Sequence, residues 1–219
     1  IINDPRVQGV ALTGSEGAGA LVAAQAGRAL KKSTMELGGA DAFIVLDDAD
    51  LDKAVKWAVF GRHWNGGQVC CSSKRIIVHE SIHDEFVRRY TEGVAQLKAG
   101  DPMEASTTLA PLSSQQAADD VRRWIDEAVA HGATATVIGA EVPRQGAFVR
   151  PVLLTGVKPG NPVYHHEFFG PVSMIFKVKD EDEAIRLAND SPFGLGGSVF
   201  TQDIERGKRV AAQISTGMV

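Results

Sequence analysis

The sequence is poor in cysteine, with only Cys70 and Cys71 among its 219 residues. Two adjacent cysteines cannot supply a disulfide framework, so a reducing, cytoplasmic environment is expected. No apolar run approaches the roughly 20 residues that a membrane-spanning helix needs, and no signal peptide is visible. The sequence therefore argues against a disulfide-stapled secreted domain and against a membrane protein.

Positive charge is also scarce. Lys and Arg total 23 against 27 Asp and Glu, which gives a net charge of −4, and no cluster of basic residues stands out. A nucleic-acid binder needs a basic patch, so no nucleic-acid partner is expected. The remaining composition is ordinary for a globular protein that is long enough to bury a real core.

Short apolar stretches alternate with longer amphipathic ones along the chain. We expect strands at 10–13, 42–46, 75–79, 135–139, 172–178 and 196–201, extended chain at 33–39 and 148–157, and helices at 16–32, 51–64, 81–98, 113–131, 180–190 and 203–214. Strands joined by helices favour right-handed crossovers. The pattern predicts an α/β fold with a mainly parallel sheet that helices cover on both faces.

Several residues have the character of helix ends. Asp50 is a candidate N-cap for the helix that starts at residue 51, and Ser81 is the first residue of a candidate capping box. Ser113 or Ser114 is expected to open the helix that follows, and Gly132 to end it.

The stretch NGGQVCCSSKR, residues 65–75, contains both cysteines. A nucleophilic cysteine needs an activated thiol and a preorganised backbone. Gly66 and Gly67 permit a tight turn, and backbone N–H groups in such a turn can hold an oxyanion. The alternative is that both cysteines are buried structural residues. Spacing alone does not choose between Cys70 and Cys71.

Two other stretches could carry chemistry. Glu36 in MELGG lies between apolar neighbours and a glycine pair, so its carboxylate is either a base with a raised pKa or a solvated side chain. LTGSEGAG, residues 12–19, reads as a strand, a Gly-Ser turn and a helix N-terminus. That is either an anion site or simply a capped helix, because the GxGxxG fingerprint is absent.

Histidines suggest two further sites. His165, His166 and Glu167 in HHEFFGPV invite a metal interpretation, but no other His or Cys recurs at ligand spacing, so no metal is expected. A Cys–His hydrolase would use one of three other histidines, and no feature of the sequence orients such a pair. Those histidines are His63, His79 and His83.

Taken in order, these stretches resemble the motifs of the aldehyde dehydrogenase superfamily. The resembling segments are TGSEGAG at 13–19, MELGG at 35–39, NGGQVC at 65–70, EFFGPV at 167–172 and EAIRLANDSPFGLGGSVFTQD at 183–203. Within the superfamily, residues 31–55 and the NDSPFGL stretch are most similar to succinate-semialdehyde dehydrogenases.

The resemblance implies that the protein oxidises an aldehyde, with succinate semialdehyde as the best guess, and that NAD or NADP is the cofactor. Cys70 would be the nucleophile that forms a thiohemiacetal and then a thioester, and Glu36 would activate the water that releases the acid. Cys71 would be a neighbour of the nucleophile that is either packed or redox-sensitive. The implied cofactor-binding residues are Gly14, Ser15, Leu37, Glu167 and Phe169, with Gln68 also facing the cofactor.

The resemblance also implies a domain organisation. Residues 1–37 would be the C-terminal part of a Rossmann-like dinucleotide-binding domain, and residues 38–219 the catalytic domain. The chain starts without Met and stops in what reads as an unfinished strand, so we expect a piece of a longer chain. Such a piece would be inactive by itself, because half of the dinucleotide site and an Asn oxyanion donor lie upstream in the family. The full-length protein is expected to be a homodimer or homotetramer.

Three questions stay open at this stage. The same cysteine could pass its thioester to CoA instead of water, although a water-activating Glu36 favours hydrolysis. A non-catalytic module with the same fold is the second alternative. Third, the basic residues Arg62, Lys74 and Arg75 near the cysteines could bind a substrate carboxylate, but basic residues at the ends of helices and strands are more often solvated.

Overall fold

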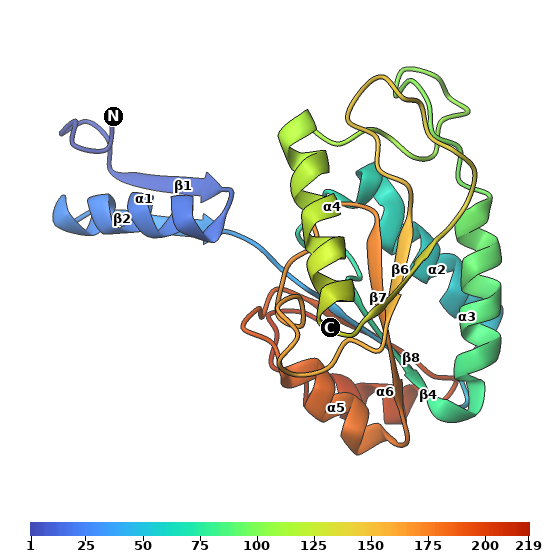
Figure 1. The fold of residues 1–219 in the computed structure, drawn as a ribbon. Helices are drawn as coiled ribbons and strands as arrows, with labels where there is room; N and C mark the ends of the chain where they lie inside the picture. Colours follow the sequence, from blue (N-terminus) through green and yellow to red (C-terminus); the bar gives the residue numbers. More distant parts are fainter. The chain divides into compact units, whose positions relative to one another are not determined.

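The computed structural model describes all 219 residues and divides them into two compact units, residues 1–39 and 40–219 (Figure 1). The boundary expected from the sequence, after residue 37, lies two residues before this division. None of the helices is both long enough and apolar enough to cross a membrane.

The first unit is a single βαβ crossover. Strand β1 (Gly9–Thr13) pairs in parallel with β2 (Lys32–Glu36), and α1 (Glu16–Arg28) connects them. The helix expected over 16–32 ends four residues early. Leu30 has a φ of 53°, and the Lys31 N–H donates to the Ala26 carbonyl. This left-handed cap stops the helix and lets Lys32 start the strand.

The second unit contains a six-stranded sheet in the order β5-β6-β7-β4-β3-β8. Its strands are β3 (Ala42–Val45), β4 (Arg75–His79), β5 (Thr134–Val137), β6 (Val152–Thr155), β7 (Val172–Val178) and β8 (Gly197–Phe200). All neighbours pair in parallel except β5 and β6. The mainly parallel sheet is therefore confirmed, with an antiparallel edge strand that the pattern did not predict.

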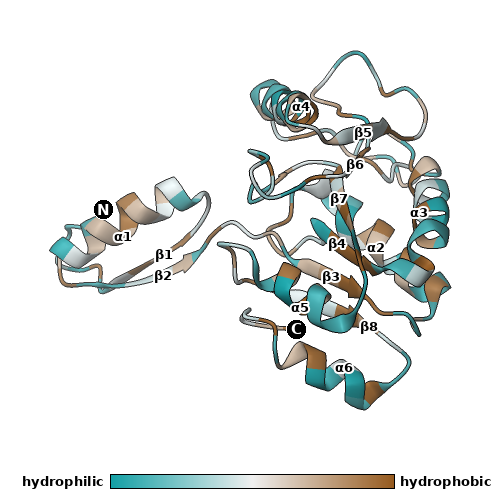
Figure 2. Ribbon diagram, turned by 60° about the horizontal axis from the view of Figure 1, so that its bottom comes forward, coloured by the Kyte–Doolittle hydropathy of each residue, from teal (hydrophilic) through white to brown (hydrophobic).

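Helices cover both faces of this sheet. They are α2 (Leu51–His63), α3 (Glu80–Ala95), α4 (Gln115–Ala130), α5 (Glu181–Asn189) and α6 (Ile204–Ala211). Alternation along β4 shows how the two cores are divided: Ile76 and Val78 pack with α2 and α3, whereas Ile77 packs with α4, α5 and α6. Figure 2 shows the apolar strands between helices whose outer faces are hydrophilic. A parallel sheet buried on both faces explains the continuous apolar runs of its strands.

Most of the expected helix ends are confirmed. Asp50 accepts a hydrogen bond from the Lys53 N–H, Ser114 accepts one from Ala117, and Gly132 adopts a φ of 93° after α4. The capping box at Ser81 is wrong. Helix α3 begins at Glu80, because the His79 imidazole accepts the hydrogen bond of the Ser81 N–H and so acts as the cap.

Candidate active site

The chain between α2 and β4 forms a tight loop around the cysteines. A single 3-10 turn, η1 (Trp64–Gly67), follows α2, and Asn65, Gly66 and Gly67 all have positive φ angles, of 52°, 64° and 79°. A Cβ atom on Gly67 would lie 2.4 Å from the Gly170 carbonyl oxygen. Gly67 is therefore required both by the backbone conformation and by the close approach of the 167–172 segment.

Cys70 and Cys71 have different surroundings. Cys70 is partly buried, and its N–H donates no hydrogen bond to another residue of the chain. Cys71 is exposed and lines an apolar cavity of about 310 Å³ together with Trp57, Phe60 and Trp64. Burial raises the pKa of the Cys71 thiol, and the neighbouring Cys70 and Asp41 act in the same direction. These effects make the thiolate form of Cys71 less favourable than that of an ordinary cysteine.

Arg62, near the end of α2, ties the cysteine loop to the 167–172 segment. Its guanidinium is fully buried and donates to the carbonyls of Val172 (2.6 Å) and Phe168 (2.7 Å) and to the carbonyl of Gly170. On its other side it donates to the Ser72 hydroxyl and, at 3.5 Å, to the Gly67 carbonyl. Burial lowers the pKa of Arg62 to about 10, which leaves it charged at neutral pH.

Lys74, just before β4, makes a second buried connection. Its Nζ donates to the carbonyls of Val69 (2.7 Å) and Cys70 (2.8 Å) and lies 3.1 Å from a carboxylate oxygen of Glu167. The side chain is fully buried. Burial and the nearby charge of Arg62 lower the pKa of Lys74, while Glu167 opposes the shift.

The structure supports neither of the two roles considered for the three basic residues, which were exposure to solvent and binding of a substrate carboxylate. Arg62, Lys74 and Arg75 are all buried, so they are not solvated. The charged groups of Arg62 and Lys74 are held by hydrogen bonds to protein atoms. Arg75 makes one hydrogen bond, from Nη1 to the Ala188 carbonyl at 3.5 Å, and its Nε and Nη2 have no hydrogen-bond partner. Arg75 lies between the rings of Tyr164 and Phe176, at 5.4 and 5.5 Å from their centroids. The donors of Arg62 and Lys74 are therefore not available to a substrate carboxylate, and the Arg75 guanidinium is enclosed by these two rings.

Glu167 and Phe169, two of the residues expected to bind the cofactor, lie beside the cysteine loop. Glu167 pairs with Lys74, and the Phe169 ring is 45% exposed with its centroid 5.9 Å from the Lys74 Nζ. An exposed aromatic face next to a partly buried cysteine can stack on a planar ligand ring.

Gln68 is used within the loop. Its amide oxygen accepts the Ser113 N–H at 2.7 Å, and its amide nitrogen donates to the carbonyls of Asn65 (3.0 Å) and Pro111 (3.3 Å). The side chain therefore braces the loop, and this bracing, rather than cofactor contact, accounts for its hydrogen bonds.

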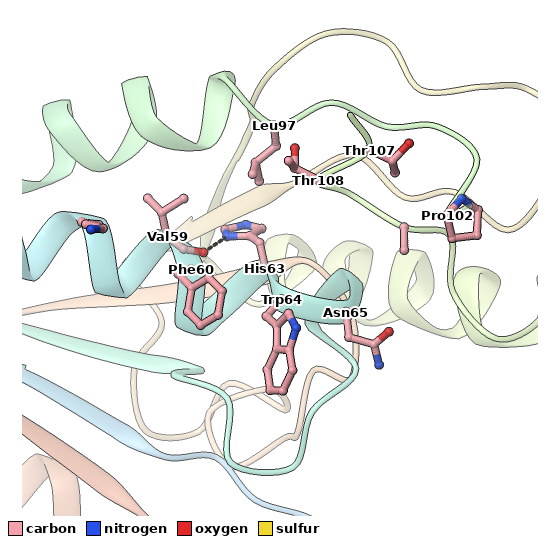
Figure 3. Close-up of a pocket in the computed structure, with 11 residues that line it drawn as sticks. Val59, Phe60, His63, Trp64, Asn65, Leu97, Pro102, Thr107 and Thr108 are labelled. Carbon is pink, nitrogen blue, oxygen red and sulfur yellow. Dashed lines mark hydrogen bonds between the residues drawn. The ribbon is translucent and has the colours of Figure 1, made fainter. Parts of the chain in front are cut away.

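The three histidines considered for a hydrolase do not contact either cysteine. His63 donates from Nδ1 to the Val59 carbonyl, and burial lowers its pKa to about 3. It lines a separate cavity of about 430 Å³ at the end of α2, which neither cysteine borders (Figure 3). His79 caps α3, and His83 pairs with Asp84.

The adjacent histidines His165 and His166 have different partners. His165 lies 3.2 Å from Asp190, whereas the His166 ring stacks on Trp124 with centroids 4.1 Å apart. Burial lowers the pKa of His166 to about 4. The structure contains no group of three or more His, Cys, Asp or Glu side chains with metal-binding geometry.

The remaining predicted residues belong to the first unit. The Ser15 hydroxyl accepts the Ala18 N–H and caps α1, and the Gly14 N–H donates to the Glu36 carbonyl. Glu36 is exposed at the end of β2, and the next residue, Leu37, packs against Gly19. Because Glu36 and Cys70 belong to different units, their pairing stays a prediction.

Residues 1–219 match the sequence profile described as the aldehyde dehydrogenase family. The chain belongs to this family. It is 51% identical to a succinate-semialdehyde dehydrogenase [NADP(+)] of Deinococcus radiodurans and 42% identical to the succinate semialdehyde dehydrogenase [NAD(P)+] Sad of Escherichia coli K12. These matches cover the whole chain and 46% and 47% of the two relatives.

A solved aldehyde dehydrogenase structure agrees with this fold. The crystal structure of succinic semialdehyde dehydrogenase from Streptococcus pyogenes, in complex with NADP+, superimposes with a TM-score of 0.95 at 52% identity. The match covers 99% of this chain and 48% of that one. The chain thus spans about half the length of the aldehyde dehydrogenases that it resembles.

Proposed function

We propose that this chain carries the catalytic half of an NADP-dependent succinate-semialdehyde dehydrogenase. The observation that carries the proposal is the cysteine loop. It presents a partly buried Cys70 with an uncommitted N–H, and two buried cations fix the backbone around it. The names of the relatives support the substrate and NADP.

In the proposed reaction the Cys70 thiolate adds to the aldehyde carbon and forms a C–S bond. The carbonyl π electrons move to oxygen, and the Cys70 N–H donates a hydrogen bond to that oxyanion. When bound, NADP+ accepts the hydride that leaves the carbon, so that a thioester remains on Cys70. Glu36 then takes a proton from water, the hydroxyl adds to the thioester, and the C–S bond breaks to release the acid.

Both units offer groups that fit a dinucleotide. In the first, Gly14 and Ser15 lead into the N-terminus of α1, where a Cβ on Gly17 would meet no atom within 4 Å, so a phosphate can approach the first turn. In the second, the Glu167 carboxylate can accept hydrogen bonds from ribose hydroxyls, and the exposed Phe169 ring can stack on a nicotinamide.

Because the donors of Arg62 and Lys74 are committed to protein partners, the carboxylate of succinate semialdehyde must be bound by a group other than these two.

The test uses the full-length protein and follows NADPH formation with succinate semialdehyde. We expect Cys70→Ala to abolish turnover and the matched Cys71→Ala variant to keep it within about threefold, because only Cys70 touches the reacting carbon. Turnover that survives in Cys70→Ala would contradict the assignment of the nucleophile. Wild-type activity on butyraldehyde but not on succinate semialdehyde would refute the substrate alone, and a requirement for CoA would replace hydrolysis with acyl transfer.

A further inference from the structure

The ammonium group of Lys74 donates two hydrogen bonds to backbone carbonyls of the cysteine loop. An ammonium group has three N–H donors, and the three oxygens around Nζ belong to Val69, Cys70 and Glu167, at 2.7, 2.8 and 3.1 Å. The side chain is fully buried, so these hydrogen bonds do not compete with water. Glu167 fixes the orientation of the ammonium, and its other two donors are directed at consecutive carbonyls of the cysteine loop.

The Val69 carbonyl is the important one of these acceptors, because it belongs to the peptide group that carries the Cys70 N–H. The Val69 carbonyl and the Cys70 N–H are the two ends of one peptide group. A cation that hydrogen-bonds the oxygen draws electron density toward it and leaves the N–H of the same group more positive. This N–H is the one that makes no hydrogen bond within the chain. Polarisation by Lys74 is therefore directed at a donor that is free to bind a ligand oxygen.

The two buried cations divide the loop between them. Arg62 reaches Gly67 and Ser72, on either side of the nucleophile, but it makes no hydrogen bond to the peptide group that joins Val69 and Cys70. Lys74 is the cation that holds that peptide group.

We propose that Lys74 is a positioning residue that polarises the Val69–Cys70 peptide and so strengthens the Cys70 N–H as a donor to the oxyanion of the reacting carbonyl. The inference rests on the proposed role of Cys70. It extends that role by assigning to a buried lysine, outside the nucleophile and the base, the strength of the oxyanion hydrogen bond.

Two reactions of the same thiolate separate this role from general support of the loop. With p-nitrophenyl acetate the Cys70 sulfur adds to the carbonyl carbon, an oxyanion forms, and p-nitrophenolate leaves as the C–O bond breaks. With iodoacetamide the sulfur displaces iodide from a saturated carbon, and no oxyanion forms. Neither reaction needs NADP. Only the first should depend on polarisation of the Cys70 N–H.

The experiment compares Lys74→Met and Lys74→Gln with wild type in the full-length protein, and mass spectrometry of peptides identifies Cys70 as the modified residue. We expect Lys74→Met to slow ester acylation about tenfold while alkylation stays within about twofold. This is less than the hundredfold or more that follows loss of an entire oxyanion donor, because the N–H itself remains. Lys74→Gln keeps neutral donors, so its acylation rate should lie between the two. The control is Lys177→Met, since Lys177 pairs with Asp84 at 2.9 Å on the surface and should change neither rate.

The outcomes are distinct. Equal acylation rates in wild type and both variants would overturn the proposal, and so would a parallel loss of acylation and alkylation, which would make Lys74 a residue that only maintains the fold. Lys74→Gln decides the matter if Lys74→Met does not fold. A wild type that forms no acyl-enzyme from the ester also overturns it. Aldehyde oxidation is measured on the same preparations. If wild type oxidises no aldehyde but the acylation ratio responds as expected, the proposed function fails and the role of Lys74 stands.

Discussion

Arg62 and Arg88 lie on α2 and α3, two helices that pack against each other, and in both side chains every guanidinium nitrogen donates a hydrogen bond. Arg88 is 54% exposed and bonds Glu85 and Glu92 on its own helix, three and four residues away. Arg62 is fully buried, and its partners Phe168, Gly170 and Val172 are 106 to 110 residues away.

The comparison separates two uses of the same side chain. Water competes for every hydrogen bond of Arg88, and its partners are already neighbours in the helix, so removing the pair changes little. The carbonyls held by Arg62 have no access to water, and they belong to the two loops that form the candidate site. Arg62 therefore contributes to the shape of the site as well as to its stability.

The sharpest test of this difference replaces each arginine by methionine in the full-length protein. Arg62→Met removes five hydrogen bonds. Because each buried acceptor left unpaired costs about 1–3 kcal/mol, we expect at least about 4 kcal/mol of destabilisation together with loss of turnover. Urea unfolding measures the first and NADPH formation the second. Equal unfolding midpoints for Arg62→Met and Arg88→Met would contradict the distinction between buried and exposed arginines.

A second test compares two glycines with positive φ, one in the buried loop and one at an exposed helix end. Gly67 has a φ of 79° and no room for a Cβ, whereas Gly132 has a φ of 93° and nothing within 4 Å of that position. Gly132→Ala should cost only the left-handed strain of about 1–2 kcal/mol. Gly67→Ala adds a clash with the Gly170 carbonyl, so we expect at least about 3 kcal/mol and a marked loss of turnover. Similar unfolding midpoints would show that the two loops can separate without cost.

These pairs also show how far the sequence alone could lead. The glycine pair and the adjacent cysteines pointed to the loop, because a glycine pair indicates a tight turn and the chain has only these two cysteines. The sequence around Arg62 and Lys74 gave no comparable indication that these side chains are buried. In sequence they are basic residues near the ends of a helix and a strand, which usually means solvated. Only the fold brings carbonyls from the 167–172 segment and from the loop itself to their charged groups.

The same reasoning explains the errors in the elements. The end of α1 depends on Leu30, an ordinary residue in a left-handed conformation that its side chain does not predict. The cap of α3 depends on a histidine that replaces the expected serine. The direction of the edge strand β5 depends on the path of the chain between it and β6, which the residues of the strand do not record.

Asp41 extends the comparison to a buried carboxylate. It accepts the Gly196 N–H at 3.1 Å, and burial raises its pKa to about 6. The folded state therefore binds the proton more tightly than the unfolded chain, so stability should rise as pH falls from above 6 toward 4. Asp41→Asn keeps an acceptor without the charge. We expect the variant to be more stable than wild type at pH 8 by up to about 3 kcal/mol, with the difference fading near pH 4.

Urea unfolding of wild type and Asp41→Asn at several pH values measures this difference. The matched surface variant is Asp52→Asn, because Asp52 is an exposed carboxylate that pairs with Arg89. A difference between wild type and Asp41→Asn that does not vary between pH 8 and pH 4 would show that Asp41 is not the group that takes up the proton.

The smallest expected effect is at Glu85, the exposed counterpart of Asp41. Hydrogen bonds from Arg88 and Arg89 lower the pKa of Glu85 to about 2. Its contribution has the opposite sign of pH dependence: it is present above the ordinary pKa of a glutamate and is lost as pH falls toward 2. Glu85→Gln should shift the unfolding midpoint slightly at neutral pH and low salt, and not at all at high salt, because exposed pairs are screened. The Arg62→Met effect should persist at the same high salt. If salt removed both effects, the buried network would be accessible to water, and the contrast between the two arginines would not hold.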